Sequence, residues 1–234
     1  MNSSRQAGSM LPRADAYLFD IDGTLLNSRD GVHYNAFHAA VREIYGIDSK
    51  IDGVPVHGNT DLGILRAVAR RAGLSDPEFE NKLPAAIACM CATAGRNAGS
   101  MAPELCPSIP ELLASLRRAG KLLGVVSGNL EPIGWLKLQV AGIKQFFAFG
   151  SFSNQRELRR DIFRHGIEEA KQRLGADARV CFVGDTPSDI DAARELSSPI
   201  LAVATGIFSA ADLLAHKPDA CIGCCSELAE AVEG

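Results

Sequence analysis

The stretch Phe19-Asp20-Ile21-Asp22-Gly23-Thr24-Leu25 organises the interpretation of the whole chain. The apolar residues 17–19 predict a short buried strand, and Gly23-Thr24 predicts the turn that follows it. Because alternate residues of a strand share a face, Asp20 and Asp22 are expected to reach one small site at its C-terminal end. A D-x-D pair is also common by chance, and the alternative is two turn-forming acids on a solvated loop.

Composition and charge limit the classes of function. The 234 residues are 47% hydrophobic with a formal net charge of -4, which predicts a globular protein without a broad basic surface for nucleic acid or anionic membranes. No apolar run reaches the roughly 18 residues of a membrane span, and residues 1–12 lack the apolar core of a signal peptide, so a cytoplasmic protein is expected. Cys221 and Cys224 have C-x-x-C spacing, but no second Cys or His pair follows, which argues against zinc.

The pattern of residues divides the chain into three parts. Residues 1–13 are rich in Ser and polar residues and are predicted to form a flexible tail. Residues 29–103 carry apolar residues at helical spacing in three successive segments, so they are predicted to form an all-helical domain inserted after the first strand. Residues 14–28 and 104–234 are assigned to one α/β core domain.

Apolar strands and amphipathic helices alternate beyond residue 104. A capping box from Ser108 to Glu111 marks the start of one predicted helix. Repeated strand and helix in this order predicts a Rossmann-like parallel sheet with helices on both faces. The later strands are predicted at 122–126, 146–149, 180–183, 200–203 and 220–222.

Three predicted strands end in polar signatures. Ligands bind at the C-terminal edge of open parallel sheets, because loop backbones and helix N-termini converge there. A cluster of carboxylates at that edge repels itself unless a cation is present, and hard oxygen ligands select Mg²⁺. The sequence therefore predicts a magnesium ion that also screens an incoming phosphate. The signatures are Asp20-x-Asp22-Gly23, Ser127-Gly128-Asn129 and Gly184-Asp185-x-x-x-Asp189.

Two of these signatures also have a purely structural interpretation. Thr186 to Asp189 fits a capping box with Pro at the first helical position, in which case Asp189 serves only its helix. Ser127-Gly128-Asn129 would then be a turn between a strand and a helix. The order of the signatures at successive strand ends favours the functional interpretation.

Together the motifs resemble those of the haloacid dehalogenase-like hydrolase superfamily, in its phosphatase type with a helical cap. The resemblance rests on D-x-D-G-T-L and G-D-x-x-x-D and covers residues 15 to about 230. It implies that Asp20 attacks phosphorus to form an aspartyl-phosphate, and that Asp22 protonates the leaving alcohol and then activates water. It also implies that Mg²⁺ is held by the Asp20 carboxylate, the Asp22 carbonyl and Asp185. Asp189 would lie near the water shell of the ion.

The resemblance further implies a basic residue that neutralises the phosphate. The usual Lys before Pro is missing after residues 149–152, and Arg159 is the predicted replacement, with Arg160 and Arg156 as alternatives. A solvated basic helix face is the structural interpretation of this run. The groups implied to hold phosphate oxygens are Ser127 and the backbone N–H groups of Gly23 and Gly128.

The implied activity is a Mg²⁺-dependent phosphomonoesterase for a small metabolite such as phosphoglycolate, a sugar phosphate or a nucleotide. A phosphomutase would use the same pair of acids and stays open as an alternative. A non-catalytic binding module would be expected to lack at least one acid, yet Asp20, Asp22 and Asp185 are all present. The expected partner is a small phosphorylated substrate, without nucleic acid or membrane, and the expected state is a monomer or weak dimer.

The helical insertion resembles the mobile cap of family members that act on small phosphorylated metabolites. Its turn at residues 58–61 is expected to reach the substrate, although helix capping by Asn59 or Thr60 accounts for the same residues equally well. His33, His38 and His57 receive no role, because a lone histidine is more often structural or exposed.

Overall fold

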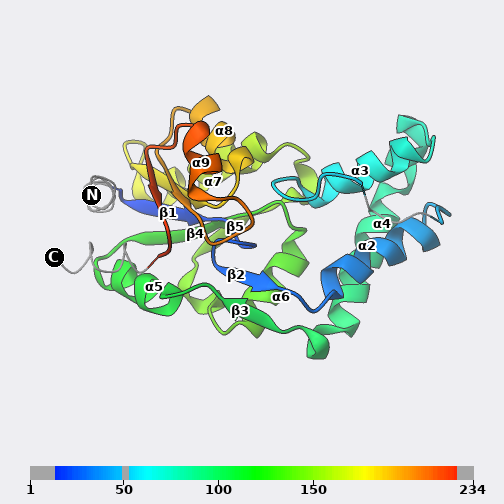
Figure 1. Ribbon diagram of the computed structural model, residues 1–234, viewed down its shortest axis with the longest axis horizontal. Helices are drawn as coiled ribbons and strands as arrows, with labels where there is room; N and C mark the ends of the chain where they lie inside the picture. Colours follow the sequence, from blue (N-terminus) through cyan, green and yellow to red (C-terminus); the bar gives the residue numbers. More distant parts are fainter. Residues whose placement is uncertain (1–13, 49–52, 226–234) are drawn as a thin grey trace.

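A six-stranded parallel sheet forms the centre of the larger lobe in the computed structural model, which describes residues 14–48 and 53–225 (Figure 1). The strand order is β5-β4-β1-β6-β7-β8, so β1 lies inside the sheet and pairs in parallel with β4 and β6. The predicted Rossmann-like parallel sheet is confirmed. The strands are β1 (Ala16–Phe19), β4 (Leu122–Val126), β5 (Phe149–Ser151), β6 (Val180–Gly184), β7 (Ile200–Val203) and β8 (Ala220–Ile222).

Helices cover both faces of this sheet, as the sequence predicts. Tyr17 and Phe19 of β1 point into one apolar cluster, and Leu18 points into the other, because successive strand residues face opposite sides. Phe163 and Phe182 stack at 4.2 Å in the second cluster. The first face is covered by α5 (Ile109–Arg118) and α6 (Glu131–Val140), and the second by α7 (Arg159–Leu174), α8 (Pro187–Glu195) and α9 (Ala210–Ala215).

A smaller helical lobe lies beyond the C-terminal edge of the sheet (Figure 1). Its apolar core also includes Leu130, directly before α6, and Ile133 of α6, so the two lobes share one packed boundary. A short antiparallel ribbon, β2 (Leu26–Ser28) with β3 (Pro103–Leu105), joins this lobe to the sheet domain. The lobe consists of α2 (Val32–Glu43), α3 (Asp61–Arg71), α4 (Asp76–Arg96) and the single turn η2 (Ala98–Ser100).

Several local predictions differ from the structure. The segment predicted as a strand at 146–149 begins in a single 3-10 turn, η3 (Lys144–Phe146), and β5 starts only at Phe149. Ser108 makes no side-chain cap to α5, because its backbone is left-handed with φ of 60°. The ribbon of β2 and β3 was not predicted, because three-residue strands carry no clear alternation. The turn η4 (Ser153–Gln155) precedes α7.

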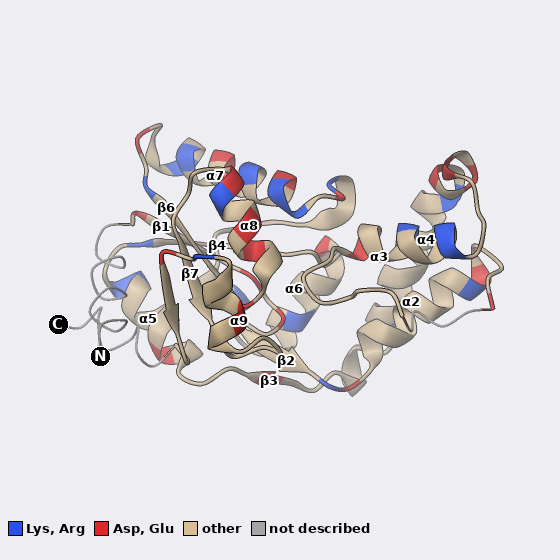
Figure 2. Cartoon of the chain, turned by 45° about the horizontal axis from the view of Figure 1, so that its top comes forward, with Lys and Arg blue, Asp and Glu red and all other residues tan. Residues whose placement is uncertain are grey.

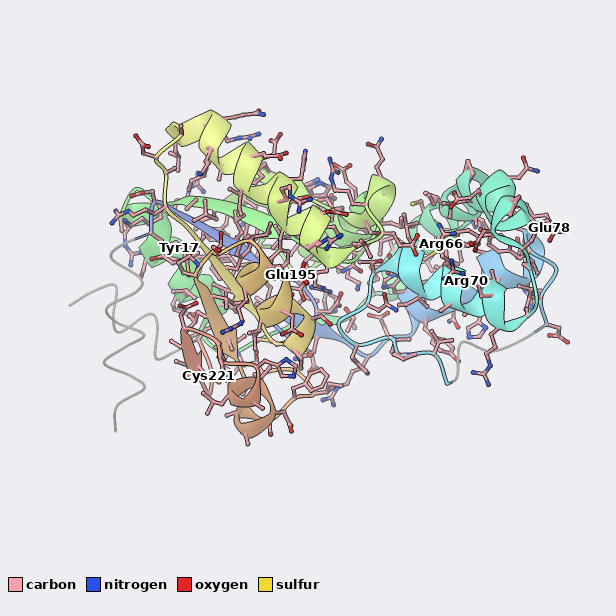
Figure 3. All side chains as sticks on the ribbon, turned by 90° about the horizontal axis from the view of Figure 1, so that it is seen from above. Tyr17, Arg66, Arg70, Glu78, Glu195 and Cys221 are labelled. Carbon is pink, nitrogen blue, oxygen red and sulfur yellow. The ribbon has the colours of Figure 1, made fainter. Side chains whose placement is uncertain are left out.

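Charged residues of both signs are interspersed along α7 (Figure 2). Cys221 lies in β8, as its apolar neighbours predict (Figure 3). Within residues 14–48 and 53–225, the helices lack the combination of length and hydropathy needed to cross a bilayer.

Candidate active site

Asp20 directly follows β1 and is the first residue of the candidate site along the chain. Its backbone N–H donates to Val183 of the neighbouring strand at 2.9 Å, which fixes the loop to the sheet edge. The Asp20 side chain is only 5% exposed. Gly23 turns the chain with φ of +86°, a conformation that a side chain would disfavour. The D-x-D segment therefore lies at the C-terminal edge of the sheet, where the sequence predicts it.

Three carboxylates from separate segments meet at this edge. Asp20, Asp185 and Asp189 each offer an oxygen atom within 4.8 Å of the other two. Thr24 donates from Oγ1 to Asp185 Oδ1 at 3.0 Å, which orients that acid. Burial raises the pKa of Asp20, despite the opposing charge of Arg159, and burial with repulsion from Asp20 raises the pKa of Asp185.

The donor set fits a hard divalent cation. Asp20 Oδ1 is buried and accepts no hydrogen bond from the described residues, which leaves a strong acceptor available for a metal ion. A Cβ atom at Gly23 or Gly206 would overlap the Asp185 carboxylate, so bare backbone shapes this wall of the cluster. All the ligand atoms are oxygens, the donor type that Mg²⁺ prefers. The Asp22 side chain lies outside this cluster of three acids.

Asp189 caps its own helix and also lies in the acidic cluster. Its Oδ2 accepts from Thr186 N at 3.0 Å and Thr186 Oγ1 at 2.6 Å, which completes the capping box of α8. Its Oδ1 accepts from Arg159 Nη1. The helix cap thus orients one oxygen and leaves the other at the acidic cluster.

Arg159 is the arginine of the predicted run that lies in the site. Its side chain is 10% exposed, and Nη1 lies 3.5 Å from Asp20 Oδ1. Burial would lower the pKa of Arg159, but Asp189 and Asp20 outweigh it and raise that pKa. Arg160 instead pairs with Glu195 on the surface, the residue labelled on α8 in Figure 3.

The side chain of Asp22 contacts a lysine that the sequence interpretation missed. Lys137 Nζ lies 2.8 and 2.7 Å from the two Asp22 oxygens, and Asn129 Nδ2 donates to Asp22 Oδ2 at 2.7 Å. Burial would raise the pKa of Asp22, but Lys137 and Asn129 outweigh it and lower that pKa. The available signal was a lysine on an apolar helix face between Ile133 and Leu138.

Ser127 and Gly128 lie where β4 meets the helical lobe. Asn129 Nδ2 donates to Ser127 Oγ at 2.8 Å, and the Gly128 carbonyl accepts from Asp61 N at 2.7 Å. A Cβ atom at Gly128 would lie 2.6 Å from the Asn59 carbonyl. The glycine thus permits the loop of the helical lobe to pack closely against the core.

The two lobes enclose a cavity of about 380 Å³ that contains the acids. Gly58 and Asn59 line it, while Thr60 caps α3 through Oγ1, which accepts from Gly63 N at 3.0 Å. The same Oγ1 donates to the Glu157 carbonyl at 2.7 Å. The 58–61 turn therefore contains the helix cap at Thr60, while contact of Gly58 and Asn59 with the substrate stays a prediction.

The three histidines without an assigned role differ in position. His33 lines the cavity and contacts both Lys137 and Asp61, at 3.1 Å each. His57 also lines the cavity. His38 lies outside the cavity lining and packs against Tyr34 at 4.4 Å. Spacing along the sequence gave no means to separate them, because the contacts of His33 come from other elements.

The sequence matches models of known protein families. A model of haloacid dehalogenase-like hydrolases matches residues 14–196. The chain belongs to this family. A second model, described as HAD-hydrolase-like, matches residues 163–231. The match spans both lobes and includes Asp20, Asp22, Asp185 and Asp189.

Relatives of this hydrolase include proteins named as phosphatases. It is 29% identical over 226 residues to a phosphoglycolate phosphatase of Synechococcus elongatus, covering 93% of this chain and 96% of the relative. It is also 29% identical to an N-acetylmuramic acid 6-phosphate phosphatase of Pseudomonas aeruginosa, covering 87% and 88% of the two chains. The fold matches CbbY from Rhodobacter sphaeroides in complex with phosphate, with a TM-score of 0.70, 19% identity and coverage of 94% and 100%. The protein is an enzyme of the phosphatase type, consistent with hydrolysis of phosphoric monoesters.

Proposed function

We propose that this hydrolase is a Mg²⁺-dependent phosphomonoesterase that acts on a small phosphorylated metabolite through an aspartyl-phosphate. The observation that supports it best is the buried group of Asp20, Asp185 and Asp189 beside Arg159, inside the cavity between the lobes. The three acids provide oxygen donors for a cation, and Arg159 provides a fixed positive charge for an anionic substrate. The separate location of Asp22 supports a different task for that acid.

The chemistry divides into two displacements. An oxygen of Asp20 attacks phosphorus and the bond from phosphorus to the leaving oxygen breaks. Asp22, which Lys137 keeps ionised in the free enzyme, takes up a proton when the anionic substrate binds and gives it to the departing alcohol. A water molecule then loses a proton to Asp22 and attacks the same phosphorus, which releases inorganic phosphate and restores Asp20. Asp22 thus regains the proton that it gave to the alcohol. Arg159 balances the charge of the phosphate in both steps.

The proposed metal ligands are the carboxylates of Asp20 and Asp185 and the backbone carbonyl of Asp22, with Asp189 beside them. Bound Mg²⁺ would neutralise the carboxylates and reduce the repulsion of an incoming phosphate. Asp20 Oδ1 accepts no hydrogen bond from the described residues, and the pKa values of Asp20 and Asp185 are raised; both observations support this assignment, because a cation relieves the cost of burying these charges.

The remaining phosphate contacts are proposed for Ser127 and the N–H group of Gly128, which line the cavity near Asp20. The Gly23 N–H, also expected to hold phosphate, instead donates to the Leu26 carbonyl at 2.8 Å, because the turn after β1 closes on itself. The helical lobe is proposed to act as a cap, because His33 and Asn59 line the same cavity from its other side. A cap that closes over the site would exclude water and select the leaving group. We infer a small metabolite as substrate, of the phosphoglycolate, sugar phosphate or nucleotide class, and a cytoplasmic monomer or weak dimer.

A continuous assay of p-nitrophenyl phosphate hydrolysis with Mg²⁺ tests the proposal. Turnover is expected to fall at least ~10³-fold in Asp20→Asn and on addition of EDTA, because both remove a component of the reacting site. Asp177→Asn on the surface is the matched control and should retain wild-type turnover. Turnover that survives in Asp20→Asn would contradict the proposal. Free phosphate released in step with the alcohol identifies a phosphatase, whereas a phosphomutase would return the phosphate to a sugar phosphate.

A further inference from the structure

We propose that Lys137 is a positioning residue that orients the Asp22 carboxylate toward the leaving group; this inference rests on the proposed function. We also propose that His33 of the helical lobe fixes the position of Lys137. Lys137 belongs to α6 of the sheet domain, and His33 belongs to α2 of the inserted lobe. The orientation of Asp22 then depends on whether the helical lobe is closed against the sheet domain. Both residues lie outside the sequence motifs that carry the acids.

Lys137 has a full set of partners. Its side chain is 3% exposed, and its three ammonium hydrogens face three acceptor groups. These are the Asp22 carboxylate at 2.8 and 2.7 Å, Asn129 Oδ1 at 2.9 Å and His33 Nδ1 at 3.1 Å. Removal of any one acceptor would leave a hydrogen of a buried ammonium unsatisfied, which is costly. The arrangement therefore specifies one position for the Lys137 nitrogen.

The direction of each hydrogen bond follows from the chemistry of lysine. An ammonium group donates and never accepts, so His33 Nδ1 accepts from Lys137 and its ring proton lies on Nε2. That Nε2 then donates to Asp61 Oδ2 at 3.1 Å, and the same oxygen accepts from Leu130 N at 2.7 Å. The chain of contacts thus runs from Asp22 in the core into the helical lobe and returns to the start of α6.

This series of hydrogen bonds controls the orientation of Asp22. Lys137 contacts both carboxylate oxygens, whereas Asn129 contacts only Oδ2. Asp22 remains 43% exposed on the cavity side, where a leaving oxygen would lie. Without Lys137 the carboxylate would keep one anchor and could rotate about its χ angles. His33 belongs to the lobe that closes the cavity. The complete set of contacts that orients Asp22 therefore exists only when that lobe is closed against the sheet domain.

The dependence of the rate on the leaving group tests this role. The value of kcat/KM reports the steps up to phosphoryl transfer to Asp20, so the later attack of water does not enter it. p-Nitrophenolate departs without a proton, whereas the alkoxide of β-glycerol phosphate requires one from Asp22. In Lys137→Met the loss of kcat/KM is expected to be at least ~10-fold larger for β-glycerol phosphate than for p-nitrophenyl phosphate.

Two further variants make the test decisive. His33→Ala is expected to show the same difference between the two substrates in the loss of kcat/KM, but a smaller one. This variant tests the inference if Lys137→Met does not fold. Lys144→Met carries the same substitution on the surface and should match the wild type on both substrates. Equal losses on both substrates in both site variants would overturn the inference while the proposed function stands. A wild-type protein without Asp20-dependent turnover would overturn both together.

Discussion

Arg66 of α3 donates from Nε to both carboxylate oxygens of Glu157, at 2.8 and 2.7 Å, and so links the helical lobe to the sheet domain. Arg66 is 15% exposed, and its guanidinium lies 4.4 Å from the centre of the Phe79 ring. Figure 3 labels Arg66 and Arg70 one turn apart on this helix. Glu157 directly precedes the segment that carries Arg159, so the same contact supports the candidate phosphate-binding arginine.

This ion pair predicts a measurable effect on substrate affinity. Glu157→Gln is expected to raise KM for p-nitrophenyl phosphate about two- to fivefold with little change in kcat, because a partly exposed pair contributes up to ~1 kcal/mol to closure. Glu80→Gln is the matched control, since it removes a partner of Arg66 within the helical lobe itself. Steady-state kinetics of both variants decide the matter. Equal values of KM in the two variants would show that the contact between lobes does not control closure.

The acidic cluster predicts a pH-dependent stability in the absence of metal. Burial raises the pKa of Asp20 and Asp185, so the folded protein retains protons that the unfolded chain releases above about pH 4. The free energy of unfolding in EDTA should therefore fall as pH rises from about 4 through the raised folded pKa values. Thermal unfolding between about pH 5 and pH 8 measures this loss. Asp185→Asn should flatten the dependence, and an unchanged slope in that variant would contradict the assignment.

Magnesium should reverse that loss of stability. At ~100 times its dissociation constant, Mg²⁺ is expected to stabilise the folded protein by ~2.7 kcal/mol, which raises Tm by about 5–10 °C for a chain of this size. The gain should be much smaller in Asp185→Asn, which lacks a proposed ligand. Tm measured with and without Mg²⁺ for both proteins provides the comparison. An identical gain in the two proteins would place the ion elsewhere.

The absence of a side chain at Gly206 leaves room for the Asp185 carboxylate in the same site. A Cβ atom there would overlap the Asp185 carboxylate, so Gly206→Ala should displace that acid and weaken Mg²⁺ binding ~10- to 100-fold. Gly99→Ala is the control, because no atom beyond its chain neighbours lies within 4 Å of the new Cβ. Calorimetric titration of Mg²⁺ measures the affinity. Wild-type affinity in Gly206→Ala would show that Asp185 does not hold the ion.

The charges of the cavity predict a preference among substrates. Among the described residues that line it, lysine and arginine occur only at 137 and 159, and both are paired with acids. Phosphoglycolate would bring a second negative charge without an unpaired lysine or arginine to receive it. We expect β-glycerol phosphate to show about a tenfold higher kcat/KM, from a cost of ~1.4 kcal/mol for the poorly paired carboxylate.

A substitution in the cavity wall tests the physical reason for that preference. Tyr34 is 41% exposed and lines the cavity from the helical lobe. Tyr34→Arg should shift the ratio of kcat/KM values toward phosphoglycolate, whereas Tyr34→Phe should leave the ratio near that of the wild type. A wild-type enzyme that already favours phosphoglycolate would contradict the prediction.

Local sequence patterns were sufficient to predict the sheet domain and the acids at its edge. The apolar residues 17–19 specify a buried strand, and the acids that follow it must then emerge at the C-terminal edge. The same reasoning places Asp185 after β6. Because β1 and β6 are neighbours in the parallel sheet, two motifs far apart in the sequence reach one site. These conclusions depend only on strand periodicity and on the parallel topology.

The sequence alone determined the fold class, the helical insertion and the positions of the candidate acids Asp20 and Asp185, because each depends on short-range periodicity. Only the tertiary structure decided which basic residues lie in the site. Lys137 meets Asp22 because α6 packs at the boundary of the lobes, and Arg159 is the arginine of its run that lines the cavity, at the start of α7. Such contacts depend on how elements pack against one another, which no local spacing encodes.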